Sequence, residues 1–152
     1  IGVGGVVVAA LSLLCLAGRY SGLGTNLIGL AFSDGTVYGW DFLAKLLFTV
    51  VTLAVGFQGG EVTPLFSIGA TLGAAAAPML GVPVPRAAAL GYAAVFGGAT
   101  NTLLAPMLIG CEVFGYQNFP LFFLVCGVAS VCSGNQCIYG GQQVSRTYRY
   151  QD

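Results

Sequence analysis

Charge is the component that this sequence lacks most. Its 152 residues include five Lys or Arg, five Asp or Glu and no His, so that 7% are charged and the formal net charge is zero. A soluble globular domain carries about 25% charged residues, and so small a number of charges cannot build a soluble surface. A neutral chain also lacks the basic face that binds DNA or RNA, so we expect no nucleic-acid partner.

Histidine and closely paired cysteines are missing as well. The five cysteines contain no Cys-x-x-Cys pair, and most of them lie in apolar runs. Cysteines in such runs usually serve as small buried hydrophobic residues, and without histidine they lack the pattern of a metal site. We therefore expect no metal and no other cofactor.

Long apolar stretches stand where the charges are missing. Hydrophobic residues make up 57% of the chain, and neither residues 1–18 nor residues 46–60 contain a charged side chain. Such gaps leave room for spans of about 20 residues, which cross a hydrocarbon core of roughly 30 Å. Residues 1–18 lack the charged start and the clear cleavage site of a signal peptide. The sequence therefore predicts an all-α, multi-pass protein of the cell membrane, surrounded by a lipid bilayer.

Glycine-rich or polar breaks divide these apolar stretches. Helices are expected at residues 1–18, 41–55, 64–79, 86–96, 103–114 and 121–131, a short or re-entrant helix at 21–32, and a last helix opening at 138–142. The breaks fall at residues 56–64, 97–102 and 133–136. Non-helical backbone at membrane depth is tolerated only where protein buries it or where it lines a cavity. Broken and re-entrant helices of this kind favour a transporter.

Charged and aromatic residues near the start of the chain are predicted to have structural roles. Arg19 and Tyr20 follow the first apolar run and are expected to anchor it at the membrane interface. Asp41 and Lys45 stand four residues apart, so they are expected to pair on one helical face.

The break at residues 56–64 has the most suggestive chemistry. It places Glu61 where hydropathy predicts lipid depth, and a charge there needs a partner or a function. A Gly-Gly pair lets backbone amides approach a ligand, while Thr63 is expected as N-cap and Pro64 as the first helical residue. The free N–H groups and the positive dipole of a helix start favour an anion. The alternative is that Glu61 caps this helix or pairs with an arginine.

Three motifs resemble a known family. Residues 59–73, Gly-Gly-Glu-Val-Thr-Pro followed by Leu-Phe-Ser-Ile-Gly-Ala-Thr-Leu-Gly, resemble the second half of the CLC chloride channel and transporter family, with its G-x-F-x-P signature and I-G-A-x-x-G helix. Ala105-Pro106 with Glu112, and then Ile138-Tyr139-Gly140, resemble later helices of that family in order and spacing. The Glu-Val pair inside the signature resembles the branch of fluoride/proton antiporters.

The resemblance implies a fold and a site. The fold is the CLC-like inverted repeat, with residues 1–150 as the C-terminal half of a transport domain whose first half, with its G-[KR]-E-G motif, is expected to be absent from these residues. The implied anion site consists of Gly60, Glu61, Val62, Thr63 and Tyr139. Backbone amides around Glu61 and Val62 would line it, and Tyr139 would donate its hydroxyl; without the resemblance, Tyr139 would be an interfacial aromatic residue.

The implied activity is transport and not an enzyme reaction. Fluoride export coupled to proton import is expected, with Glu61 as the proton-coupling carboxylate and with a homodimer as the assembly. One alternative is a voltage-gated chloride channel or a chloride/proton exchanger of the same fold. A more distant alternative is a membrane fragment that transports nothing.

Overall fold

The structure is a computed structural model that describes residues 2–14, 18–33, 36–57, 59–134 and 136–139. Every regular element in these ranges is a helix: α1 (Gly2–Leu14), α2 (Thr25–Phe32), α3 (Asp41–Ala54), α4 (Val62–Leu80), α5 (Val84–Thr100), α6 (Leu104–Phe114), the 3-10 helix η2 (Tyr116–Asn118) and α7 (Phe119–Ser133). The predicted all-α fold is confirmed. Of the last predicted helix, only Ile138 and Tyr139 are described, and neither is helical; the rest lies outside the described residues.

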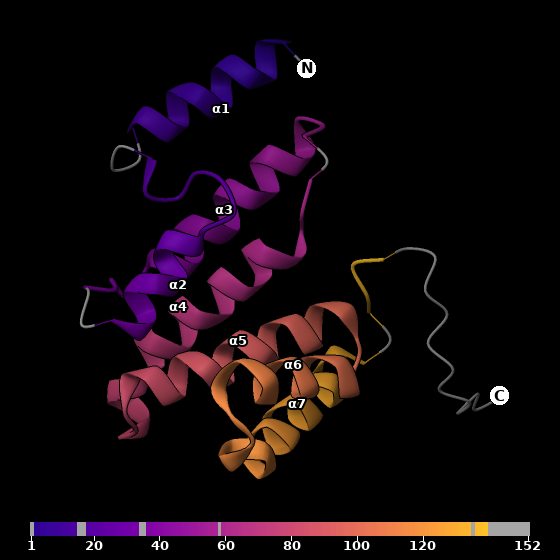
Figure 1. Cartoon of the computed structure of the whole chain (residues 1–152). Coiled ribbons are helices and arrows are strands. Elements are labelled where there is room, and N and C mark those ends of the chain that lie inside the picture. Colours follow the sequence, from indigo (N-terminus) through magenta and orange to yellow (C-terminus); the bar gives the residue numbers. More distant parts are fainter. Residues whose placement is uncertain (1, 15–17, 34–35, 58, 135, 140–152) are drawn as a thin grey trace, which may run out of the picture.

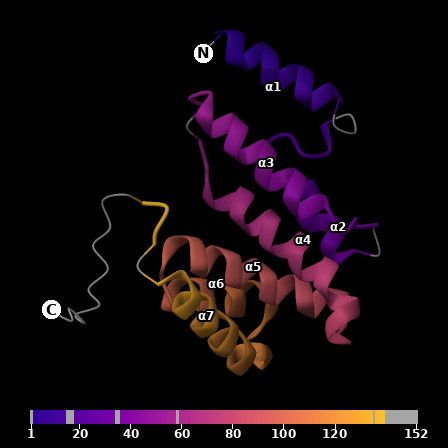
Figure 2. The ribbon, with the colours of Figure 1, turned by 180° about the vertical axis from the view of Figure 1, so that it is seen from behind.

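A helical hairpin of α4 and α5 forms the centre of the molecule (Figure 1). The helices α2 and α3 pack on α4, whereas α6 and α7 pack on α5. In both Figure 1 and Figure 2, α1 lies at one end of this arrangement, beyond α3. The hairpin therefore carries the start of α4 toward the α1–α3 side and the end of α5 toward α6 and α7.

Glycines let the two central helices touch along their backbones. A Cβ on Gly69 would overlap the carbonyl oxygen of Gly91, and a Cβ on Gly73 would overlap that of Ala87. Small residues at such positions let two helices of a membrane protein approach closely. The phenyl ring of Phe66 adds to it by stacking on Tyr92, with 4.0 Å between the ring centroids.

One predicted interruption of a helix is wrong. The break expected at residues 97–102 begins only at Asn101, because α5 continues through Gly97 and Gly98 to Thr100. Gly97 serves close packing instead, since a Cβ there would lie 3.0 Å from Cγ of Pro106. Pro106 does not interrupt α6, because it is the third residue of the helix, where no intrahelical hydrogen bond is lost.

The short helix expected at residues 21–32 is also shorter than predicted. Gly22 and Gly24 adopt positive φ angles of 66° and 82°, which delay the start of α2 until Thr25. L-residues with side chains rarely adopt this conformation, whereas glycine does so without steric cost. Residues 18–24 therefore form a compact loop between α1 and α2.

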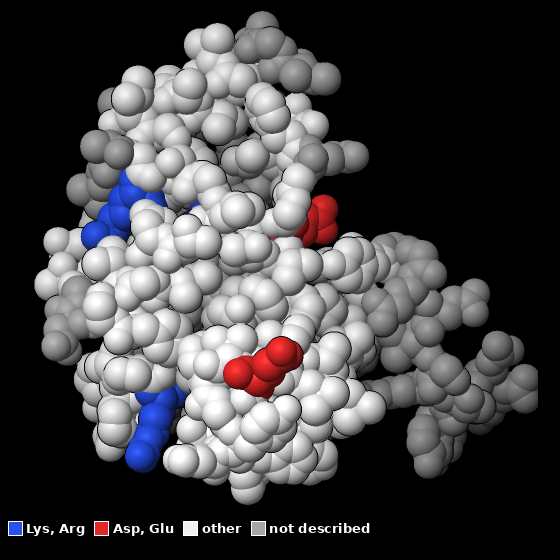
Figure 3. All heavy atoms as spheres, in the orientation of Figure 1, with Lys and Arg blue, Asp and Glu red and all other residues white. Residues whose placement is uncertain are grey.

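Two helical stretches are long and apolar enough to cross a membrane, Val62–Leu80 and Tyr116–Ser133. Protein buries 56% of the first stretch but only 17% of the second, so the second presents most of its apolar surface outward. The face drawn in Figure 3 carries a few separate charged side chains on a surface that is otherwise uncharged, as expected for a protein in contact with lipid.

Candidate functional site

The chain is not helical at the start of the break before α4, as its glycines predict. The chain leaves α3 at Ala54 and enters α4 at Val62. Gly56 and Gly60 have positive φ angles of 93° and 30°, so both positions favour glycine. This non-helical segment connects two apolar helices and presents the start of α4 to the α1–α3 side of the molecule.

The start of α4 leaves several backbone amides without helical partners. The helix begins at Val62, with Glu61 as N-cap and without a side-chain capping bond, so the prediction that Thr63 is the N-cap is wrong. Thr63 and Pro64 are instead its second and third residues, because the Leu65 N–H already donates to the Glu61 carbonyl over 3.3 Å. The N–H groups of Glu61, Val62 and Thr63 have no acceptor within the helix, and Pro64 has no N–H. Amides arranged in this way can bind an anion.

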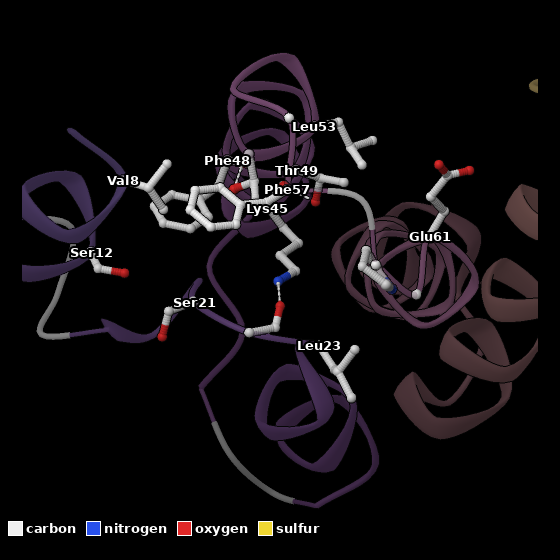
Figure 4. A pocket seen from close by; sticks show the side chains of 16 residues that line it. Val8, Ser12, Ser21, Leu23, Lys45, Phe48, Thr49, Leu53, Phe57 and Glu61 are labelled. Carbon is white, nitrogen blue, oxygen red and sulfur yellow. Dashed lines mark hydrogen bonds between the residues drawn. The ribbon is translucent and has the colours of Figure 1, made fainter. Parts of the chain in front are cut away.

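A cavity of about 530 Å³ lies beside this helix start. Its walls come from α1, from residues 21–23, from α3 between Lys45 and Leu53, and from the break before α4. Gly60 and Glu61 line it, whereas Val62 and Thr63 stand next to it in the first turn of α4. In Figure 4 the Glu61 carboxylate extends away from the Lys45 ammonium, so the two opposite charges do not pair.

Lys45 lines the cavity, whereas the sequence predicts that it pairs with Asp41. The residue is 1% exposed, and its Nζ donates to the carbonyl oxygens of Tyr20 and Gly22, each over 2.8 Å. The predicted pair of Lys45 with Asp41 is wrong, because loop carbonyls surround the ammonium. A lysine in the middle of an apolar helix was a visible signal that the side chain needs buried partners, but its spacing suggested the wrong one.

Asp41 instead forms a network with the loop between α1 and α2. Its carboxylate accepts hydrogen bonds from Arg19 at 2.7 Å and from the Tyr20 hydroxyl at 2.6 Å. Tyr20 is 4% exposed, so its predicted role as an interfacial anchor is wrong. Burial, with help from the hydrogen bond to Asp41, raises the pKa of Tyr20 to about 12 and keeps it a neutral donor at physiological pH. The network fixes the loop that forms one wall of the cavity.

Tyr139 is not among the residues that form the cavity wall. It follows α7, is 42% exposed, and its backbone N–H donates to Sγ of Cys137 over 3.4 Å. It does not line the cavity, so the structure brings together Gly60 and Glu61 with the amides of Val62 and Thr63, but not Tyr139. The contact between Tyr139 and an anion stays a prediction.

Comparisons with known proteins agree with these features. The family model described as "Voltage gated chloride channel" matches residues 1–134. A "Chloride/fluoride channel protein" of Pseudomonas syringae pv. tomato (strain ATCC BAA-871 / DC3000) is 44% identical over 133 residues, covering 88% of this chain and 29% of the relative. A solved structure titled "Crystal structure of a CLC-type fluoride/proton antiporter" is 53% identical, with a TM-score of 0.88, and the match covers 91% of this chain and 35% of that one.

The match covers 29% of the Pseudomonas relative and 35% of the chain in the solved structure, so this chain spans about a third of the length of each. The family model, by contrast, matches most of the chain. The resemblance inferred from residues 59–73 is therefore confirmed, and the chain belongs to the voltage gated chloride channel family, the CLC proteins.

Proposed function

We propose that this chain forms the C-terminal half of a transport domain that exports fluoride across the cell membrane in exchange for protons. The observation that carries the proposal is the start of α4, where the amides of Glu61, Val62 and Thr63 lack helical acceptors beside a cavity lined by Gly60 and Glu61. The 53% identity to a CLC-type fluoride/proton antiporter supports fluoride as the anion. Homodimeric assembly, with a separate pathway in each subunit, is part of the same proposal.

The helix start suits a small anion such as fluoride. Fluoride holds its water tightly, so a site must replace that water with several hydrogen-bond donors in fixed positions. The amides at Glu61, Val62 and Thr63 supply such donors. They carry only partial positive charges, so they bind the ion without holding it as tightly as a full positive charge would, and the ion can leave again. The Tyr139 hydroxyl adds a neutral donor from the segment that follows α7.

Glu61 couples the anion to a proton. An ionised carboxylate repels an anion held at the amides of its own helix start, whereas a protonated carboxyl group can donate a hydrogen bond to it. Fluoride and a proton therefore stabilise each other at the site. Binding of each ion changes the affinity for the other, and this reciprocal linkage couples the movement of fluoride to that of protons.

The test compares Glu61→Gln with the unaltered full-length protein in liposomes. Fluoride efflux is followed with a fluoride electrode and proton uptake with a pH-sensitive dye. The variant is expected to lose proton uptake while it retains part of its fluoride flux, since glutamine keeps the shape and a hydrogen-bond donor but cannot carry a proton. Glu112→Gln is the matched control, because Glu112 is an exposed carboxylate on α6 that does not line the cavity. Unchanged coupling in Glu61→Gln would overturn the role of Glu61.

A chloride channel or a chloride/proton exchanger is the second candidate. The description of the family and the name of the Pseudomonas relative, which includes chloride, favour it. The ratio of fluoride to chloride flux in the same liposomes separates the two. A ratio well above one with stoichiometric proton movement supports the antiporter, whereas a chloride flux without proton movement supports the channel. Absence of any flux from the full-length protein would favour a membrane protein without transport activity.

A further inference from the structure

The segment that follows α7 is held by the end of α5. The Nδ2 of Asn101 donates to the carbonyl oxygen of Gly134 over 2.8 Å, joining residues that are 33 positions apart. Gly134 is the residue at which α7 ends, and its φ of 57° turns the chain away from the helix axis. The side chain of Asn101 thus binds the chain at the point where the path toward Tyr139 begins.

Two further hydrogen bonds fix the same segment to consecutive residues of α5. The backbone N–H of Ile138 donates to the carbonyl oxygen of Ala99 over 3.0 Å. The Cys137 thiol donates to the carbonyl oxygen of Thr100 over 3.3 Å. Two residues of α5, Ala99 and Thr100, and the C-cap Asn101 therefore hold residues 134, 137 and 138, directly before Tyr139.

The left-handed backbone at position 101 does not by itself explain why the residue there is asparagine. Its φ of 50° and ψ of 44° are left-handed, and it is the one non-glycine residue with positive φ among the residues that the structure describes. Glycine would meet that requirement with no steric cost. The side chain is buried, with the residue 9% exposed, and its amide is committed to a carbonyl of a distant segment. The contribution of the Asn101 side chain to the structure is therefore its hydrogen bond to the Gly134 carbonyl.

We propose that Asn101 is a positioning residue for anion binding, because its amide holds Gly134 at the start of the path to Tyr139 and thereby helps to set the place of Tyr139. This inference rests on the proposed function, in which the Tyr139 hydroxyl donates to the anion. Asn101 itself does not line the cavity beside α4 and acts through the chain that it holds. Its loss loosens the segment, so that Tyr139 spends less time where its hydroxyl can reach the anion.

Two substitutions remove the hydrogen bond and retain the backbone. Asn101→Gly accepts the left-handed conformation and deletes the side chain, whereas Asn101→Asp keeps its shape but presents oxygen atoms to the Gly134 carbonyl. Glycine and aspartate alter the site in different ways. If the two variants give the same result, the cause is therefore the lost hydrogen bond and not a folding defect. Asn26→Asp is the matched control, since Asn26 donates its Nδ2 to the Arg19 carbonyl over 2.7 Å, away from this segment.

The first measurement needs no transport activity. Cys137, which is partly exposed, reports on the segment through its rate of reaction with an uncharged maleimide in the full-length protein with Cys15 and Cys132 replaced by serine. Loss of one hydrogen bond shifts a local opening equilibrium by roughly fivefold, so both Asn101 variants are expected to react about that much faster. Asn26→Asp is expected to react at the original rate. An unchanged rate in both Asn101 variants would overturn the inference.

The second measurement is fluoride transport at a series of fluoride concentrations. The apparent KM is expected to rise in both Asn101 variants, by no more than roughly fivefold, with little change in maximal flux, because the site is complete for less of the time. Faster maleimide reaction with an unchanged KM would show that Asn101 holds the segment without positioning an anion ligand, and would also overturn the inference. Failure of the unaltered protein to transport fluoride would instead refute the proposed function.

Discussion

The contact between α4 and α5 allows a sharp test of how the site is supported. In Gly73→Ala, the new Cβ would overlap the carbonyl oxygen of Ala87 and stand 2.7 Å from its carbon and 3.0 Å from Cα of Ala88. All three atoms are backbone, so no side-chain rotation can make room. Ordinary contact begins at 3.4 Å, so the carbonyl carbon alone requires the helices to separate by about 0.7 Å.

The expected cost follows from overpacking. Forcing an additional methyl group into a well-packed contact costs about 1–3 kcal/mol. Replacement of a helical glycine by alanine also gains about 1 kcal/mol of helix propensity, which opposes that cost. Gly127→Ala on α7 provides the control, because a Cβ at Gly127 meets no atom within 4 Å and the propensity gain is shared. The difference in stability between the two variants therefore measures the overlap alone, about 1–3 kcal/mol.

The assay is thermal unfolding of the purified full-length variants in detergent, followed by loss of the folded peak in size-exclusion chromatography. Gly73→Ala is expected to unfold at a lower temperature than Gly127→Ala. Fluoride efflux from liposomes is expected to slow as well, because α4 carries Gly60 and Glu61 at its start and moves with the contact. Equal unfolding temperatures for the two variants would refute the argument that this backbone contact limits the position of α4.

Two further predictions concern the buried charges beside the cavity. Lys45→Met leaves the carbonyls of Tyr20 and Gly22 without their donor and is expected to destabilise the protein by about 2–4 kcal/mol, measured as a lower unfolding temperature in detergent. Asp41→Asn weakens the bonds to Arg19 and Tyr20 and is expected to cost about 2–3 kcal/mol in the same assay. Unfolding temperatures equal to that of the Glu112→Gln control would contradict either prediction.

Helix positions were largely predictable because hydrophobic runs and glycine breaks are local features. The break before α4 was found from its glycines, and the structure confirms positive φ angles at Gly56 and Gly60. The same reasoning failed at Gly97, where glycine accommodates Pro106 of the neighbouring helix and the chain stays helical. A glycine that turns the chain and a glycine that makes room for a neighbour look alike until the neighbour is known.

The partners of the buried charged residues were not predictable from local sequence either. The burial of Asp41 and Lys45 was predictable, since a charged side chain in an apolar helix needs a partner. Their partners were not, because Asp41 and Lys45 each bind a loop about 20 residues away in the chain rather than one another. Local spacing on a helix favoured the wrong pair.

The sequence by itself determined the membrane class, the all-helical fold, the family and the anion-friendly start of α4, because composition, hydrophobic runs and a contiguous motif are all written along the chain. Only the tertiary structure decided which residues enclose the cavity, that Lys45 stands in its wall, and that Asn101 holds the segment before Tyr139. Those facts depend on contacts between distant segments, and such contacts are set by helix packing, which no local pattern specifies.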